Sequence, residues 1–357
     1  MEQTRLQNHS ALKDEFLSTI KDMIRDRGNI CVSIIVPTHR FGQNRVEDRD
    51  EIQSAVLAAE QAVQYKAGNL MMKINDLYSQ IDLNKNKEGI GIFVSRHIQK
   101  IIKFPFNVTK KVVVNNFFHL HDLLYVVNYN IRYYLIDISK EDIRVYQGTL
   151  DHLQEITNAD FPQRINLNRV EYKAASQLNE ALEKADKSLS KWLPSKTVPL
   201  IICGTEGNIA TFKSISIHND NLIGSISDKY TNVELDDLQI LAWLQIKSFV
   251  DQQKLKLISD LEDRIDIGDA VCGVEEVWKA SKESAGGTLL VEKDYGRGVF
   301  VTKDGRLHVH YPQGKHIKYP DAVNEIIATV LQKDVKVIIV EKDALKDNKR
   351  IVLIKSD

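Results

Sequence analysis

The sequence predicts an α/β protein built from three small α/β domains. Its 357 residues are enough for two or three domains that each bury a core. Helical and strand-like segments alternate along the chain, and the run VPLIICG (198–204) is apolar throughout, which is typical of a central strand. We place the domains at residues 1–125, 126–266 and 267–357.

The first domain is predicted as helices followed by strands. Apolar residues recur every four positions over 11–27, which predicts an amphipathic helix, and the run CVSIIV (31–36) before Pro37 predicts a buried strand. The other elements expected here are helices over 46–66 and 69–81 and strands at GIFVS, HIQKIIKF and KKVVVN.

The second domain opens with IRYYLIDISKEDIRVYQG (131–148), in which two apolar runs surround a polar turn and predict a β-hairpin. The elements expected after it are a polar loop (158–169), a helix (171–192), the apolar strand and a long helix or helix pair (235–265).

The third domain is predicted as a small α/β sandwich, because helices and strands alternate through it. Its expected elements are a helix (270–284), a strand (288–292), a hairpin around Asp304-Gly305, a helix (322–332) and strands at 335–340 and 351–354.

Composition restricts the function. The formal net charge of −1 lacks the basic character of a protein that coats nucleic acid, so DNA is not an expected partner and any RNA contact must be local. Cys31, Cys203 and Cys272 form no CxxC pair, which argues against disulfides and thiolate zinc sites. No signal-peptide core or run of about 18 apolar residues occurs. We therefore expect a cytoplasmic protein without a membrane partner.

Five segments in collinear order resemble one family: VSIIVPTHR, GIFVS with KFPFNVTKKVVVNNFFHLHDLLYVV, the hairpin RYYLIDISKEDIRVYQG, VPLIICGTEGNIATFKSIS and AGGTLLVEKDYGRGVFV. Together they resemble the bacterial relatives of the archaeo-eukaryotic release factors, a group that includes Pelota-like proteins and ribosome-hibernation factors. The resemblance implies an RNase H-like middle domain and a C-terminal domain like kink-turn-binding ribosomal proteins. It also implies binding to ribosomal RNA in the A site and docking of an elongation-factor-Tu-like GTPase.

The catalytic loop of release factors is missing. In that family a Gly-Gly-Gln loop of the middle domain aims a glutamine backbone amide at the peptidyl-tRNA ester, which requires glycine flexibility and an oxyanion donor. The one Gly-Gly pair here, Gly286-Gly287, precedes Thr288 in the third domain, and the expected loop position, NADFPQRINLNR (158–169), has no glycine. We therefore expect no peptide release.

Two groups of polar residues are candidates for RNA contact, because arginine forks fit phosphate oxygens and stack on bases. One follows the predicted strand 31–36 and the other lies on the glycine-free loop. The alternatives are helix-surface ion pairs for Arg45 and Arg49 and an ordinary polar surface for the loop. The candidates are Thr38, His39, Arg40, Arg45 and Arg49, then Gln163, Arg164, Asn166, Asn168 and Arg169.

A third group would bind the GTPase by resemblance, although by its residues alone EKDYGRG (292–298) is a hairpin turn. Its members are Glu292, Lys293, Asp294, Tyr295 and Arg297.

Other motifs carry little functional signal. His119-x-His121 and His308-x-His310 would each share one side of a strand but have no third ligand nearby, so we expect no metal and no cofactor. Gly204 to Gly207 (GTEG) is predicted as a strand-to-helix turn, since it matches no phosphate-binding motif. The tract Lys100, Lys103, Lys110 and Lys111 is either a small basic face or a guard against strand aggregation.

The sequence thus favours a non-enzymatic factor that occupies the ribosome during hibernation or stress, or in rescue of stalled ribosomes. Two alternatives stay open. One is a metal-dependent RNA hydrolase using Asp137, Glu141 and Asp142, which would have to hold two metals about 4 Å apart. The other is a protein-interaction scaffold outside translation.

Overall fold

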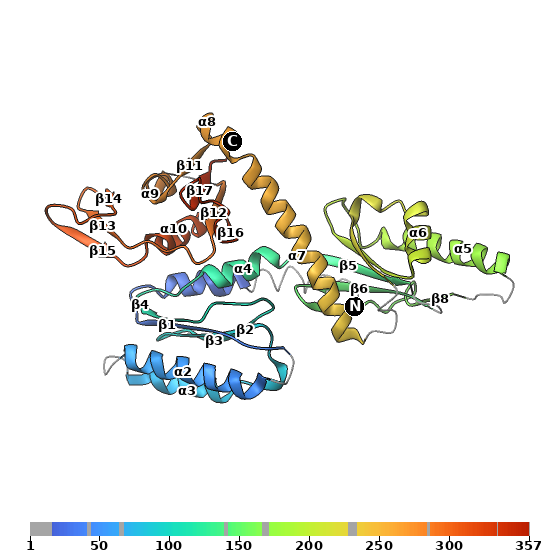
Figure 1. Cartoon of the computed structure of the whole chain (residues 1–357), viewed down its shortest axis with the longest axis horizontal. Helices are drawn as coiled ribbons and strands as arrows, with labels where there is room; N and C mark the ends of the chain where they lie inside the picture. The colour runs from blue at the N-terminus through green and yellow to red at the C-terminus, as the bar shows by residue number, and fades with distance from the viewer. Residues whose placement is uncertain are drawn as a thin grey trace. The chain divides into compact units, whose positions relative to one another are not determined.

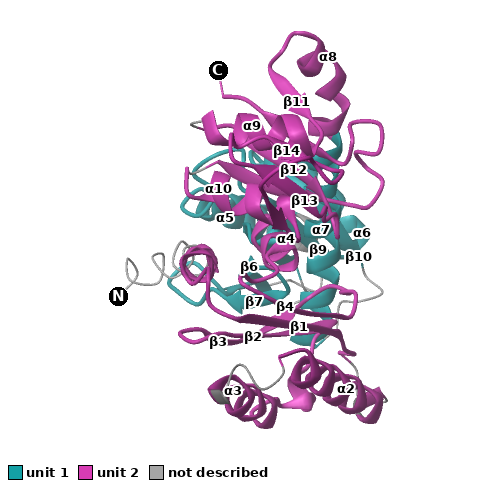
Figure 2. Ribbon diagram, turned by 90° about the vertical axis from the view of Figure 1, so that its left-hand side faces the viewer, with its two compact units in different colours: residues 1–9, 129–255 teal, residues 10–128, 256–357 magenta. Residues whose placement is uncertain are grey.

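The computed structural model describes residues 16–40, 44–63, 68–138, 142–165, 171–227, 234–283, 286–333 and 335–356. These residues fall into two compact units, coloured separately in Figure 2. Unit 1 holds residues 129–255, and unit 2 combines residues before 129 with residues 256–357. Both are mixed α/β structures, as predicted. The three domain boundaries stay a prediction.

The N-terminal part of unit 2 is an antiparallel sheet of order β3-β2-β1-β4. Figure 1 shows α2 and α3 on one face and α4 on the other. The core on the α2 side contains Val32, Ile34, Ile52 and Ile74. The elements are β1 (Cys31–Pro37), α2 (Arg45–Val63), α3 (Gly68–Ser79), η3 (Leu83–Lys85), β2 (Gly89–Val94), β3 (Gln99–Phe104), β4 (Lys111–Asn115) and α4 (His121–Tyr129).

Unit 1 is built on a sheet of order β10-β9-β5-β6-β7, and β8 pairs with β6. The predicted hairpin is confirmed as antiparallel β5 and β6, and the apolar strand is confirmed as β9, buried and parallel to both β5 and β10. The elements are β5 (Arg132–Ile138), β6 (Asp142–Thr149), β7 (His152–Glu155), β8 (Gln163–Arg164), α5 (Glu171–Leu189), β9 (Leu200–Gly204), α6 (Glu206–Ile215), η4 (Asn219–Asn221), β10 (Leu222–Ser227) and α7 (Leu235–Ser259).

The C-terminal part of unit 2 has a sheet of order β11-β17-β12-β16 and a separate small sheet of order β14-β13-β15. Two asparagines bond it to the N-terminal part: Asn128 donates to Val337 O and accepts from Ile339 N, both at 2.7 Å, and Asn324 donates to Phe118 O at 3.1 Å. The elements are α8 (Leu261–Asp266), β11 (Ala270–Cys272), α9 (Val274–Glu283), β12 (Thr288–Glu292), β13 (Val299–Thr302), β14 (Leu307–His308), β15 (His316–Tyr319), α10 (Ala322–Leu331), β16 (Lys336–Val340) and β17 (Ile351–Ile354).

Some local predictions are wrong. The helix expected over 270–284 starts only at Val274, because residues 270–272 pair with β17 as a short strand. Segment 292–298 is not a hairpin turn, since it joins β12 and β13, which lie in different sheets. Nor is 158–169 wholly a loop, because Gln163 and Arg164 pair with β6.

Two smaller motifs are also clarified. Thr205 caps α6 by accepting from Asn208 N at 3.0 Å, so the GTEG segment is the predicted strand-to-helix turn. His119 and His121 lie before and at the start of α4, so the expectation that they share a strand is wrong. Within the described residues, no helix is long and apolar enough to span a bilayer.

Candidate functional site

The loop after β1 is organised by a buried carboxylate. Thr38 is buried, and its hydroxyl donates to Lys87 O at 2.8 Å. Asp48 on α2 accepts the backbone N–H of His39 at 3.0 Å, and its other oxygen lies 2.7 Å from His39 Nδ1. Asn86 donates to the same carboxylate at 3.2 Å. Thr38 and Asp48 therefore shape the loop, while the imidazole of His39 is about half exposed at 52%.

The arginines of this region differ in how far their side chains are exposed. Arg40 is largely buried and its Nε lies 3.3 Å from Glu88 Oε1. Arg49 is exposed on the first turns of α2. The side chain of Arg45 lies outside the described residues. The structure thus leaves His39 and Arg49 as the groups of this loop region that can reach a partner directly.

The described candidates of unit 1 are held by strand pairing and side-chain contacts. Phe161 is fully buried, and Gln163 on β8 donates its side-chain amide to Ala181 O at 2.9 Å. Arg164 pairs with Asp142 of β6 in the strand register, and its side chain is exposed. Asn166, Asn168 and Arg169 lie outside the described residues. Among the described candidates of unit 1, Arg164 is therefore the cation that a partner could reach.

In the third group, Glu292 is a buried side chain. Its carboxylate accepts Leu345 N at 2.8 Å and Arg350 Nε at 2.6 Å. Lys293 donates to Asn107 O at 3.2 Å, and its ammonium lies 4.8 Å from the ring centroid of Tyr125. Glu292 and Lys293 therefore hold unit 2 together.

Asp294 takes part in a mostly buried charge network with residues of β4 and α4. Lys111 Nζ lies 2.5 Å from Asp294 and 2.8 Å from Asp122, so Lys111 contributes to no basic face. Burial alone would raise the pKa of Asp122, but His119 and Lys111 outweigh it and hold that pKa well below its usual range. The described chain contains one group of three potential metal ligands, namely His119, Asp122 and Asp294. Their ligand atoms all lie within 4.8 Å of one another. The Lys111 ammonium is already ion-paired with both carboxylates.

His121 gives this network a pH dependence. Burial, together with the charge of neighbouring His119, lowers the pKa of His121 to about 3. The unfolded chain takes up a proton near pH 6.5 while the folded chain does not, so acid favours unfolding. We expect the free energy of unfolding to fall by up to about 2 kcal/mol between pH 6.5 and about 5, measured by urea titration.

The matched control for this prediction is the exposed His310. A His121→Leu variant should lose that part of the pH dependence, whereas His310→Leu should keep it. Equal slopes in the two variants would show that His121 does not titrate as described. The loss from Asp122 comes at lower pH, since the pKa of a free aspartate is about 3.9.

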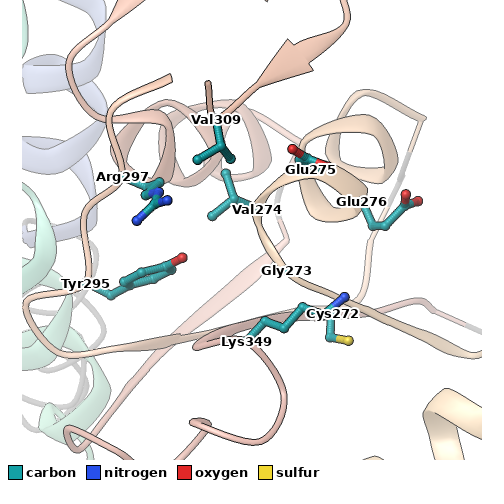
Figure 3. A pocket seen from close by; sticks show the side chains of 9 residues that line it. All are labelled: Cys272, Gly273, Val274, Glu275, Glu276, Tyr295, Arg297, Val309 and Lys349. Atoms are coloured by element: carbon teal, nitrogen blue, oxygen red, sulfur yellow. The ribbon is translucent and has the colours of Figure 1, made fainter. Parts of the chain in front are cut away.

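Tyr295 and Arg297 border a hollow of about 280 Å³ at the start of α9. Figure 3 shows these two side chains on one side and the first turn of α9 on the other. Burial raises the pKa of Tyr295, and Arg350 Cζ lies 4.5 Å from its ring centroid. The remaining lining residues are Cys272, Gly273, Val274, Glu275, Glu276, Val309 and Lys349. Acidic and basic groups both line this hollow, so its charge favours no single ligand.

The residues of the hydrolase alternative form no such group of three in the described chain. Burial raises the pKa of Asp137 on β5, and a hydrogen bond from the Cys203 thiol and the charge of Arg144 act against it. Asp142 lies 3.4 Å from Arg144. Glu141 lies outside the described residues. No specific observation favours hydrolysis at this end of the sheet.

Residues 132–284 match the family described as "Bacterial archaeo-eukaryotic release factor family 3". This region is similar to the bacterial archaeo-eukaryotic release factors. The match confirms the family recognised from the sequence, and it begins at the hairpin β5–β6. It covers the sheet of unit 1 and ends after α9, so the family 3 region includes Gln163, Arg164 and Asp137.

Several solved structures are also similar over much of the chain. The archaeal translation termination factor aRF1 is 12% identical, with 97% of this chain and 98% of that chain covered and a TM-score of 0.28. A ribosome-bound archaeal Pelota is 11% identical, with coverages of 97% and 94% and a TM-score of 0.41. Dom34 of S. cerevisiae is 12% identical, with coverages of 75% and 73% and a TM-score of 0.34. No curated protein matches the sequence.

Sequence reasoning missed the residues that organise these groups. Asp48 is one of several acidic residues at the start of α2, and nothing in its local pattern shows that it is buried. Lys111 and Asp294 are separated by more than a hundred and eighty residues, yet they form an ion pair. The run KKVVVN does predict a strand that contains Lys111, but its partner can be found only from the tertiary fold.

Proposed function

We propose that this protein is a ribosome-associated translation factor that occupies the A site without hydrolysing peptidyl-tRNA, in hibernation or in rescue of stalled ribosomes. The observation that carries the proposal is the family 3 match over 132–284, combined with the absence of a Gly-Gly-Gln motif from the sequence. A cytoplasmic location follows from this role.

The position of the expected catalytic loop supports the non-hydrolytic part. Peptide release needs a flexible glycine-rich segment that aims a backbone donor at the developing oxyanion. Here Phe161 is buried, and Gln163 is held on β8 with its amide donating to Ala181 O. The Gly286-Gly287 pair lies in unit 2, beside the end of β17. Neither segment supplies the required group.

Two partner surfaces are included in the proposal. Exposed cations and half-exposed polar groups, namely His39, Arg49 and Arg164, would contact ribosomal RNA. The exposed residues Asp294 and Arg297, beside the hollow at α9, would contact an elongation-factor-Tu-like GTPase. The buried members of each group would hold these contacts in position.

The first test is sedimentation with ribosomes. Purified protein is expected to pellet with 70S ribosomes and to release no peptide from a stalled complex above the background rate. Charge reversal in Arg164→Glu should weaken the ribosome affinity about tenfold, because a phosphate contact is replaced by repulsion. Affinity is measured by pelleting at a series of ribosome concentrations and two salt concentrations.

The matched control is Lys213→Glu, which reverses an exposed charge on α6 of the same unit. Its affinity should stay within about twofold of the unmodified protein. Failure of the unmodified protein to sediment with ribosomes would refute the proposal. Peptide release by it would refute the non-hydrolytic part alone.

A further inference from the structure

The small sheet β14-β13-β15 is locally basic, unlike the chain as a whole. Residues 299–319 contain Lys303, Arg306, Lys315 and Lys318 against the single acid Asp304, while the whole chain has a net charge of −1. Figure 1 shows this sheet projecting from the sheet that contains β12 and β16. A basic, projecting element is suited to an anionic partner.

Strands β13 and β14 bury apolar side chains on one face of the small sheet. Val299 and Val301 of β13 and Leu307 of β14 are buried, and Tyr319 of β15 packs edge-on against Trp278 of α9 with ring centroids 5.5 Å apart. The strand register places Phe300 opposite both His308 and Lys318. Because side chains alternate along strands, these residues belong to the other face.

That other face presents aromatic rings. Phe300, Tyr311 and His316 form a cluster with centroid separations of 5.3, 5.2 and 4.6 Å. Tyr311 is 76% exposed although it is large and aromatic. An exposed ring that is already positioned by two neighbours loses little freedom when a flat ligand stacks on it. The face therefore suits stacking on an unpaired base.

The cations lie beside this cluster. Thr302, Lys303, Asp304, Gln313 and Lys315 line an open hollow of about 410 Å³. Within the described residues Asp304 pairs with Arg306 at 3.1 Å, and Lys303, Lys315 and Lys318 make no ion pair with a described carboxylate. Their charge is thus left for a ligand. Phosphate groups fit such exposed lysines, and Gln313 offers a further hydrogen-bonding group.

We propose that the β14-β13-β15 sheet is a binding surface for single-stranded RNA, with Tyr311 stacking on a base and Lys303 and Lys315 contacting the backbone. Aromatic rings interleaved with cations are the combination used for single-stranded nucleic acid, whereas double-stranded RNA hides its base faces. The choice of RNA over DNA rests on the proposed function. On the ribosome the target would be an unpaired loop or bulge of ribosomal RNA.

The test measures fluorescence anisotropy of the full chain with a labelled single-stranded RNA of about 12 nucleotides and with its duplex. We expect salt-sensitive binding to the single strand and weaker binding to the duplex. Tyr311→Ala should weaken single-strand binding about tenfold, Tyr311→Phe should retain it, and Lys315→Glu should weaken it about tenfold or more. The matched control, Lys342→Glu, reverses an exposed lysine just after β16 and should change affinity less than about twofold.

The outcomes separate this surface from the proposed function. Equal RNA affinities for the unmodified chain, Tyr311→Ala and Lys315→Glu would overturn the inference, as would tighter binding to a poly-glutamate peptide than to RNA. If RNA binding depends on Tyr311 but the unmodified chain fails to sediment with ribosomes, only the ribosomal role is lost. If the unmodified chain sediments with ribosomes but the unmodified chain, Tyr311→Ala and Lys315→Glu have equal RNA affinities, only the proposed role of this sheet is refuted.

Discussion

Replacing Gly287 by alanine is expected to lower the free energy of unfolding by about 3 kcal/mol or more. Gly287 has a φ of +102°, where an L-residue with a side chain is strained. An added Cβ would overlap the carbonyl oxygen of Ile354 and lie 3.1 Å from Ser356 N. Both are backbone atoms at the end of β17, so relief requires moving that strand away from β12. Urea titration followed by circular dichroism measures the loss.

Gly286→Ala provides the control because it shares the backbone strain without the overlap. Gly286 has a φ of +101°, but its added Cβ would approach only the side chain of Ser356, at 3.2 Å from Oγ. A serine side chain can rotate away. The loss of stability should therefore be smaller than for Gly287→Ala by at least about 1 kcal/mol. Equal losses would mean that the strand end adjusts freely and that only φ matters.

The glycine pair shows which of its properties can be predicted from the sequence and which require the structure. The sequence alone shows that no glutamine follows Gly287, which removes it from the release chemistry. It does not show why glycine is there, because the strained φ and the approach of Ile354 arise from the pairing of β12 with β17. These two strands are about sixty residues apart in the chain.

Elements with a strong local pattern were predicted well. The hairpin β5–β6 has apolar residues at many positions of both strands, and β9 is an unbroken apolar run. The burial of these side chains matches the two patterns. Several strands were missed, and two of them are very short. Residues 270–272 and 163–164 are too short to show a period, and each exists as a strand because a distant partner, β17 or β6, offers hydrogen bonds.

Candidate side chains were harder to predict than elements. Polar residue type suggests exposure, and it does so correctly for Arg49, Arg164 and Arg297. It fails for Thr38 and Glu292, which are buried because partners elsewhere in the chain satisfy their polar atoms. Burial of a polar group depends on long-range hydrogen bonds, and no window of local sequence contains them.

Glu292→Ala is expected to destabilise unit 2 by about 2–3 kcal/mol. Glu292 is fully buried at the end of β12, where its carboxylate accepts Leu345 N at 2.8 Å and Arg350 Nε at 2.6 Å. Removing the carboxylate leaves a buried N–H without its acceptor and deprives Arg350 of its partner. Glu292→Gln keeps an acceptor for Leu345 N but loses the charge, so its loss should be intermediate. Both are measured by urea titration.

The control is Glu275→Ala, which removes an exposed carboxylate from the first turn of α9 and should change the free energy of unfolding by less than about 0.5 kcal/mol. The comparison also decides between two roles for Glu292. If Glu292 bound the partner directly, its replacement would lower the affinity for a GTPase and leave the free energy of unfolding unchanged. The burial of Glu292 predicts instead that the replacement lowers stability, and that any loss of partner binding is a consequence of unfolding. Partner binding should then be normal at a temperature where the variant is still folded.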